Sequence, residues 1–196
     1  MTELPPDELA ALDGCYLQPG ASLLELGNKK NSTGLYRDWY ERQGIVYECI
    51  DWNGLDGAWK FDMREPEIWQ VILSAFQVEG FGGSHGRAQT VTNFGFTEHV
   101  GETLEEQHEC WRNVHQLIQY NGALAICMPL MPYWKGHGRW MPTPEWYQEM
   151  ADLNGYWIRN VTIWDRVRPT FVATLTKRSR DEWIAPTASE IVRSDL

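Results

Sequence analysis

The sequence predicts an α/β fold in which helices cover both faces of a mostly parallel sheet. Short apolar runs that suit buried strands alternate with segments of helical spacing along the chain. The last two apolar runs are separated only by "DRVRP" (165–169), which predicts an antiparallel hairpin at one edge of the sheet. The 196 residues contain no internal repeat and no long linker, so we expect one domain over residues 1–196.

The first half of the chain is expected to supply three strands and three helices. Pro6 suits the first turn of the first helix, and Gly14 can end it. Ser32 or Thr33 can cap the second helix, and Gly44 can close it. The predicted strands are 21–27 and 45–52, with a short third strand within 58–66, and the predicted helices are 6–13, 32–44 and 66–76.

The second half contains the clearest helix of the chain. Thr103 and Glu106 have the spacing of a capping box, and Gly122 lies past the predicted end of this helix. A glycine-rich loop (79–88) precedes the first strand of this half. A loop rich in Trp, Gly and Pro follows the second strand, 123–130. The predicted strands are 88–96, 123–130, 156–164 and 170–178, and the predicted helices are 103–120 and 143–153.

Charge and composition exclude some classes of partner. A net charge of −10 argues against binding to nucleic acid, which needs clustered Lys and Arg. Residues 1–14 lack the basic start and apolar core of a signal peptide, and no apolar run is long enough to span a bilayer. We therefore expect a soluble, cytoplasmic protein that does not bind a membrane.

The cysteines and tryptophans carry weaker signals. Cys15, Cys49, Cys110 and Cys127 are widely spaced, which indicates free thiols rather than a zinc site or a disulfide framework, and we expect no bound metal. Most of the eleven tryptophans are expected to pack in the core. The alternative is that two of them, Trp134 and Trp140, line a pocket for a flat or sugar-like ligand.

The stretch "LLELGNKKNSTG" (23–34) marks the turn after the first strand, where α/β sheets commonly bind ligands. It does not match the phosphate loop G-x-x-x-x-G-K-S/T. It does not match G-x-G-x-x-G either, because Lys29 and Asn31 stand in positions that would crowd a pyrophosphate. A ligand with an adenosine and no phosphates suits this turn better.

"LLELG" followed one strand later by "YECIDW" resembles the cofactor site of class I S-adenosylmethionine-dependent methyltransferases. The similarity extends over about residues 20–178. It implies a Rossmann-like three-layer sandwich with a seven-stranded sheet, and S-adenosylmethionine as the cofactor. In that family the first strand ends E/D-x-G-x-G-x-G. Glu25 and Gly27 match this motif, while Lys29 and Asn31 occupy the later glycine positions.

The resemblance also implies contacts to the nucleoside. Asp51 would accept both ribose hydroxyls, although it also suits a turn before "NG", and Trp52 would stack on the adenine unless it packs in the core. Asp62 would accept from the adenine amino group and Met63 would cover the ring, whereas helix capping is the alternative for Asp62 or Glu65. The residues expected to bind the cofactor are Glu25, Gly27, Asn28, Lys29, Asp51, Trp52, Asp62, Met63, Asn93 and Phe94.

The methionyl end of such a cofactor carries an ammonium and a carboxylate. Glu25 and backbone carbonyls near Asn93 are expected to hold the ammonium. Lys29 or Lys30, with the N–H groups that open the next helix, are expected to hold the carboxylate. The alternative for Lys29 is an exposed surface lysine.

The segment "TNFGFTEHV" (92–100) follows the fourth strand, where this family places the methyl acceptor. His99 is the expected general base, and Glu98 would orient or assist it; capping of the following helix is their alternative role. His137, between two glycines, is a further candidate for the catalytic base, and a lid residue, a substrate contact or a plain surface residue are its other expected roles. We expect His85 to be a flexible-loop residue, and His108 and His115 to be structural or solvent-facing.

The function predicted from these features is S-adenosylmethionine-dependent methyl transfer to a small molecule. "NFGF" lacks the two prolines of the N-P-P-F/Y motif found in methyltransferases that act on nucleobases, which argues against that substrate class. An NAD(P)-dependent oxidoreductase and a non-catalytic cofactor-binding module acting through a partner are the alternatives. The methyl acceptor and the oligomeric state stay open.

Overall fold

The computed structural model describes residues 3–15, 17–32, 34–130, 133–164, 168–179, 182–187 and 191–193. Its main sheet has seven strands in the order β5-β4-β1-β6-β7-β10-β9. All neighbouring strands pair in parallel except β10, which is antiparallel to both of its neighbours. The predicted fold class is thereby confirmed. In sheet order, the strands are β5 (Trp59–Lys60), β4 (Val46–Asp51), β1 (Ser22–Leu26), β6 (Ala88–Phe94), β7 (Ile118–Pro129), β10 (Thr170–Lys177) and β9 (Tyr156–Trp164).

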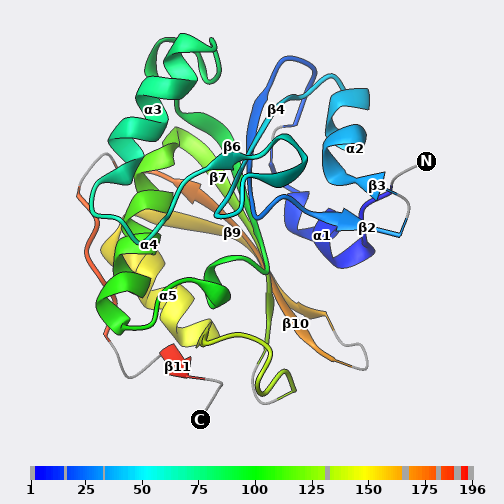
Figure 1. The fold of residues 1–196 in the computed structure, drawn as a ribbon. Helices are drawn as coiled ribbons and strands as arrows, with labels where there is room; N and C mark the ends of the chain where they lie inside the picture. Colours follow the sequence, from blue (N-terminus) through cyan, green and yellow to red (C-terminus); the bar gives the residue numbers. More distant parts are fainter. Residues whose placement is uncertain are drawn as a thin grey trace.

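Helices cover the two faces of this sheet (Figure 1). On one side lie α1 (Pro6–Leu12) and α2 (Tyr36–Arg42), and on the other α3 (Ile68–Val78), α4 (Leu104–Leu117) and α5 (Pro144–Leu153). Alternation along β1 divides its side chains between two cores: Leu23 packs with α1 and α2, while Leu24 and Leu26 pack with the other three helices. Burial of each such leucine contributes roughly 1.5–3 kcal/mol.

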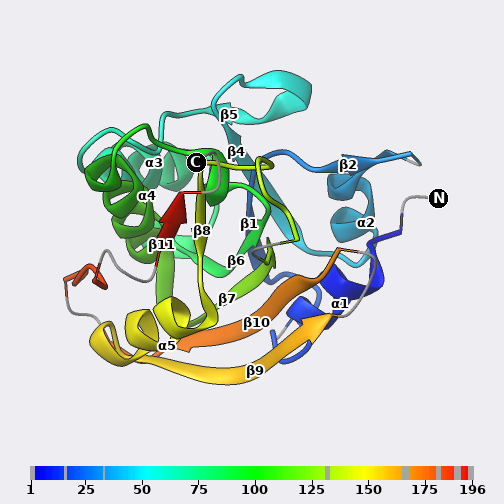
Figure 2. The same ribbon diagram turned by 90° about the horizontal axis from the view of Figure 1, so that it is seen from below.

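The carboxyl-terminal edge confirms the predicted hairpin. Strands β9 and β10 pair antiparallel from Thr170↔Trp164 to Lys177↔Tyr156 (Figure 2). Strand β10 lies between β7 and β9 and is almost fully buried, whereas exposed and half-buried residues alternate along β9 after the buried Tyr156, as suits an edge strand. Among the described residues, no helix combines the length and the apolar character needed to cross a bilayer.

The capping box of α4 is confirmed. Thr103 Oγ1 accepts a hydrogen bond from the Glu106 backbone N–H at 3.2 Å, and Glu106 Oε2 accepts one from the Thr103 N–H at 3.1 Å. Two donors at the helix start that would otherwise lack intrahelical partners are thereby satisfied.

Several predicted boundaries are wrong. The helix expected at 32–44 begins only at Tyr36, because the small hairpin of β2 (Lys30–Asn31) and β3 (Gly34–Leu35) precedes it. Leu35 occupies the cap position without a side-chain cap, and Thr33 lies outside the described residues. By contrast, the short third strand expected within 58–66 is confirmed as β5 (Trp59–Lys60).

The other differences involve pairing over long distances. Residues 118–120 extend β7 instead of α4, because Ile118 pairs with Ala88 of β6. In the Trp/Gly/Pro-rich loop, the short strand β8 (Trp140–Pro142) pairs with β11 (Ile191–Arg193). Local sequence does not indicate either pairing, because the partners are far away along the chain.

Candidate functional site

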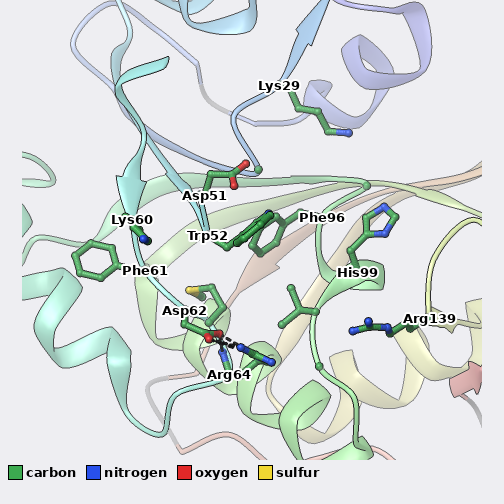
Figure 3. Close-up of a pocket in the computed structure, with 15 residues that line it drawn as sticks. Lys29, Asp51, Trp52, Lys60, Phe61, Asp62, Arg64, Phe96, His99 and Arg139 are labelled. Carbon is green, nitrogen blue, oxygen red and sulfur yellow. Dashed lines mark hydrogen bonds and ion pairs between the residues drawn. The ribbon is translucent and has the colours of Figure 1, made fainter. Parts of the chain in front are cut away.

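A cavity of about 590 Å³ lies at the carboxyl ends of the central parallel strands. Ligands bind at this edge of α/β sheets because successive strand-to-helix loops meet there. Figure 3 shows Lys29 and His99 on one side of this first cavity and Lys60 and Phe61 on the other. It is lined by Gly27, Lys29, Asp51, Trp52, Lys60, Phe61, Asp62, Met63, Arg64, Gly95, Phe96, His99, Val100, Gly101 and Arg139.

Gly27 begins the turn after β1. Its φ is +76°, a region that L side chains rarely adopt, and its N–H donates to the Ile50 carbonyl at 2.8 Å. A Cβ added at this position would lie 2.8 Å from Phe96 Cδ2. The turn therefore needs glycine for its backbone conformation and also for the close approach of Phe96.

The three residues after Gly27 have different surroundings. Asn28 does not line the cavity: its Nδ2 donates to the Leu55 carbonyl at 2.7 Å and thus ties two loops together. Lys29 does line it. Lys30 lies away from the cavity in a surface ion pair with Asp56, at 3.5 Å between Nζ and Oδ2.

Glu25 is fully buried on the α1/α2 side of the sheet and does not line the cavity. Its Oε2 accepts from the Tyr47 hydroxyl at 2.5 Å and from the Lys29 N–H at 3.1 Å. Burial raises the pKa of this carboxyl to about 8, against the lowering effect of the two hydrogen bonds. In this structure Glu25 positions the loop that carries Lys29.

Asp51 and Trp52 stand at the end of β4 and line the cavity. Asp51 Oδ1 accepts from the Asn53 N–H at 3.1 Å, so the expected turn role and a position at the cavity occur together. Trp52 is 72% exposed, and core packing is therefore the wrong alternative for this ring.

Asp62 and Met63 also line the cavity, but Asp62 is already engaged. Arg64 binds its carboxylate through both the side chain, with Nη2 to Oδ2 at 2.6 Å, and the backbone N–H, at 3.0 Å. These contacts hold the pKa of Asp62 below its usual value. Met63 is buried, and Asn113 of α4 fixes the segment by donating to its carbonyl at 3.1 Å.

Asn93 and Phe94 shape the turn after β6 without lining this cavity. Asn93 Nδ2 donates to Thr97 Oγ1 at 2.8 Å, and its Oδ1 accepts from the N–H groups of Phe96 and Thr97. The Asn93 side chain is thus used to fold the turn. Phe94 is buried and lines a second cavity, described below.

Three of the predicted catalytic side chains come together at this turn. Glu98 Oε1 lies 3.5 Å from Nε2 of His99 and 3.9 Å from Nε2 of His137. Neither Glu98 nor His99 caps α4, whose start is closed by its own capping box, so that alternative is wrong. Burial raises the pKa of Glu98 to about 7 and lowers the pKa values of both histidines below their usual value.

A second cavity of about 580 Å³ adjoins the first and shares Lys29 and Gly95 with it. Trp134 lines this second cavity, whereas Trp140 is buried and donates to the Gly101 carbonyl, so the two tryptophans differ in role. The lining residues are Asp7, Glu8, Lys29, Phe94, Gly95, Glu98, Cys127, Pro129, Trp134, His137, Arg168 and Thr170.

Sequence reasoning missed several lining residues. Arg64 and Arg139 both reach the first cavity, and Arg139 also donates its N–H to the Glu98 carbonyl at 2.7 Å. The only sequence signal for Arg64 was its place two residues after Asp62. Helix α1 contributes Asp7 and Glu8 to the second cavity, and no motif marked them.

The remaining histidines are not at either cavity. His85 is exposed in the glycine-rich loop. His115 is buried, and its Nδ1 lies 2.9 Å from the Tyr156 hydroxyl, which agrees with the structural role expected for it.

Comparison with known proteins identifies the fold. Neither a protein-family model nor a curated protein matches the chain. Among solved structures, the N-methyltransferase NodS of Bradyrhizobium japonicum with S-adenosylhomocysteine has a TM-score of 0.60 at 8% identity, over 87% of this chain and 83% of NodS. The 1,6-didemethyltoxoflavin N1-methyltransferase of Burkholderia thailandensis, also with S-adenosylhomocysteine, scores 0.55 at 13% identity, over 89% and 77%.

The chain therefore has the fold of class I S-adenosylmethionine-dependent methyltransferases. The same fold also occurs in the 4+2 cyclase SpnF, with a TM-score of 0.58 at 11% identity, over 87% of this chain and 80% of that one. Because one fold hosts different reactions, the function must be argued from the site.

Proposed function

We propose that this protein binds S-adenosylmethionine in the first cavity, which contains Asp51 and Trp52, and transfers the methyl group to a small molecule in the second cavity, which contains Trp134 and His137. One observation carries the proposal: the carboxylate of Asp51 and the exposed ring of Trp52 end β4 at a cavity bounded by the Gly27 turn. The solved methyltransferases of this fold that contain S-adenosylhomocysteine support it.

The lining residues fit the parts of this cofactor. Asp51 would accept the ribose hydroxyls, while Trp52 and Met63 would provide apolar surfaces for the adenine. Lys29 would bind the methionyl carboxylate, because its side chain is the basic group at the junction of the two cavities. Asp62 is a weaker adenine contact than expected, since Arg64 already occupies its carboxylate.

The residues at the junction of the two cavities would align the methyl acceptor and remove its proton. When bound, the cofactor supplies a methyl group on a cationic sulfonium, which an acceptor displaces in line. The chain must align that acceptor and remove its proton where it carries one. Glu98, His99 and His137 are the candidate catalytic residues for this, because they border the cavities and lie close together.

The alternative functions have less support. A nicotinamide cofactor needs a bare glycine turn for its pyrophosphate, and Lys29 stands at that place. A module that only binds the cofactor would not need a cluster of titratable side chains between two cavities. We also place the reaction in the cytoplasm, since four free cysteines suit a reducing compartment.

Titration of tryptophan fluorescence tests the proposal, because Trp52 lies at the cavity. S-adenosylhomocysteine is expected to bind and NAD is not. Asp51→Ala should weaken the binding of S-adenosylhomocysteine by about 1.5–3 kcal/mol, the range for hydrogen bonds to a charged group. Asp152→Ala, on the exposed side of α5, is the control and should leave this affinity unchanged. Transfer of a labelled methyl group to screened hydroxyl and amino compounds then tests turnover.

Equal affinity for NAD, or an Asp51→Ala protein that binds as well as the parent, would refute this assignment of the cavity. Binding of S-adenosylhomocysteine without transfer to any acceptor would leave a cofactor-binding module as the better description.

A further inference from the structure

Glu98 is buried without the partners that a buried carboxylate needs. The side chain is fully inaccessible, and among the described residues neither of its oxygens has a hydrogen-bond partner. An unpaired carboxylate in such a place is costly unless it is protonated or faces a cation. Arg139, the nearby arginine, pairs with Glu102 at 2.6 Å instead.

The backbone around Glu98 brings His137 to it from a distant loop. The Arg139 N–H donates to the Glu98 carbonyl at 2.7 Å. A Cβ on Gly138 would lie 2.6 Å from Glu98 Cγ, so only glycine permits this approach. The loop after β7 is thereby held against the turn after β6, with His137 and His99 rings 5.2 Å apart.

These three side chains have the geometry of a metal-binding site. One ligand atom from each of Glu98, His99 and His137 lies within 4.8 Å of the others. Ligands bound to one ion at about 2.0–2.2 Å are roughly 3–3.5 Å from one another, so small side-chain rotations would complete the site. Two imidazoles and one carboxylate suit zinc-type transition metals, whereas magnesium and calcium prefer oxygen ligands alone.

We propose that Glu98, His99 and His137 bind one divalent transition-metal ion, of the Zn²⁺ or Co²⁺ type, at the junction of the two cavities. The ion would supply the positive partner that Glu98 lacks. Two His and one Glu are three ligands, and catalytic sites of this kind keep a position open.

The charges around Glu98, His99 and His137 limit the affinity of this cluster for a metal ion. Lys29 Nζ and Glu98 Oε1 lie 3.2 Å and 3.0 Å from the point that a Cβ on Gly95 would occupy, so this ammonium is the main competing cation. Among the described residues Lys29 forms no ion pair, and its flexible side chain can turn toward either cavity.

The catalytic consequence rests on the proposed function. A metal ion lowers the pKa of an oxygen acceptor bound at its open position. The acceptor's proton would pass to solvent, and the methyl group would exchange its bond to sulfur for a bond to that oxygen. The site therefore points to acceptors with a hydroxyl group, in particular those with two neighbouring hydroxyls that can both reach the ion.

Cobalt titration tests the site without requiring turnover. The full chain, freed of metal by a chelator, is titrated with Co²⁺ and followed by its visible absorption bands. We expect the absorption bands to saturate at one equivalent of Co²⁺. Zn²⁺ should displace the bound Co²⁺, and Mg²⁺ should not. Glu98→Gln, His99→Gln and His137→Ala should each weaken binding more than about 100-fold, since loss of a ligand exceeds the effect of removing its supporting partners.

His85→Ala is the matched control, because this exposed histidine is outside both cavities. It should bind Co²⁺ like the parent. Tryptophan fluorescence should show S-adenosylhomocysteine affinity unchanged in His137→Ala, which also confirms that this variant folds. Absence of a one-equivalent site, or variants that bind Co²⁺ like the parent, would refute the metal site and leave the proposed cofactor site standing.

Discussion

At the scale of single residues, two neighbouring lysines have different surroundings. The sequence treats Lys29 and Lys30 as equivalent candidates for the methionyl carboxylate. The structure separates them, because Lys29 lines both cavities while the Lys30 side chain is 68% exposed beside Asp56. A surface ion pair of this kind contributes little to stability.

Lys29→Ala is therefore expected to weaken S-adenosylhomocysteine binding more than adenosine binding, because only the former carries a carboxylate. A charge-assisted contact of this kind contributes about 1.5–3 kcal/mol. Lys30→Ala is the matched control and should leave both affinities unchanged. Calorimetric titration with the two ligands measures this, and equal losses for both ligands in Lys29→Ala would remove this lysine from the amino-acid end of the site.

Glu25 makes the stability of the fold depend on pH. Its folded pKa, about 8, is above the unfolded value of 4.5, so between these values the folded state holds more protons than the unfolded state. The free energy of unfolding should therefore fall as pH rises through this window, with a slope of up to about 1.4 kcal/mol per pH unit from this group.

Glu25→Gln is expected to remove that slope, because the amide resembles the protonated acid in shape. Urea denaturation at pH 5, 6, 7 and 8 measures the free energy of unfolding for both proteins. The free energy of unfolding of the variant should increase relative to that of the parent as pH rises. Glu8 and Glu98, whose pKa values burial also raises to about 7, titrate in both proteins, so the comparison is made between the two slopes. Parallel curves would show that Glu25 ionises normally in the fold.

At the scale of elements, the turns after β1 and β6 build the site together. Gly27 and Phe96 come from different turns, and the missing Cβ of one makes room for the ring of the other. The same packing explains why the glycine at 27 is required although those at the later motif positions are replaced. Asn28 and Glu25 hold the first turn, and Asn93 holds the second.

Gly27→Ala should destabilise the protein more than Gly20→Ala. Both glycines have positive φ, +76° and +86°, so both substitutions carry the backbone strain, of order 1 kcal/mol. Only at Gly27 does the new Cβ meet a side chain, whereas nothing lies within 4 Å at Gly20. Thermal unfolding and S-adenosylhomocysteine titration of the two variants measure the difference. Equal effects would mean that Phe96 moves aside without cost.

At the scale of the whole molecule, the cavity joins segments that are far apart in sequence. Its lining comes from the turns after β1, β4 and β6, from the segment after β5 and from Arg139 near β8. A ligand that contacts all of them binds only the folded chain, and such binding raises the free energy of unfolding according to ligand concentration.

S-adenosylhomocysteine at 100 times its dissociation constant should stabilise the fold by about 2.7 kcal/mol. For a chain of this size that corresponds to an increase in melting temperature of roughly 5–11 °C. NAD at the same concentration should give none, and Asp51→Ala should lose most of the shift. Differential scanning calorimetry measures it, and an equal shift with NAD would contradict the proposed cofactor.

The sequence by itself determined the fold class, the order of the main strands and helices, the capping box of α4 and the place of the glycine turn after the first strand. These features depend on hydrophobic periodicity and on local turn chemistry, which a sequence expresses directly. It also marked Glu98, His99 and His137 individually as candidates for chemistry.

Only the tertiary structure decided which of those candidates share a site and which support it. Glu25 and Asn93 belong to the folding of the turns, because their hydrogen bonds are made to the backbone and to Tyr47 or Thr97. His137 reaches Glu98 through the close approach that Gly138 allows across 40 residues of chain. Such contacts depend on how loops pack at the end of the sheet, and neither periodicity nor residue spacing records that packing.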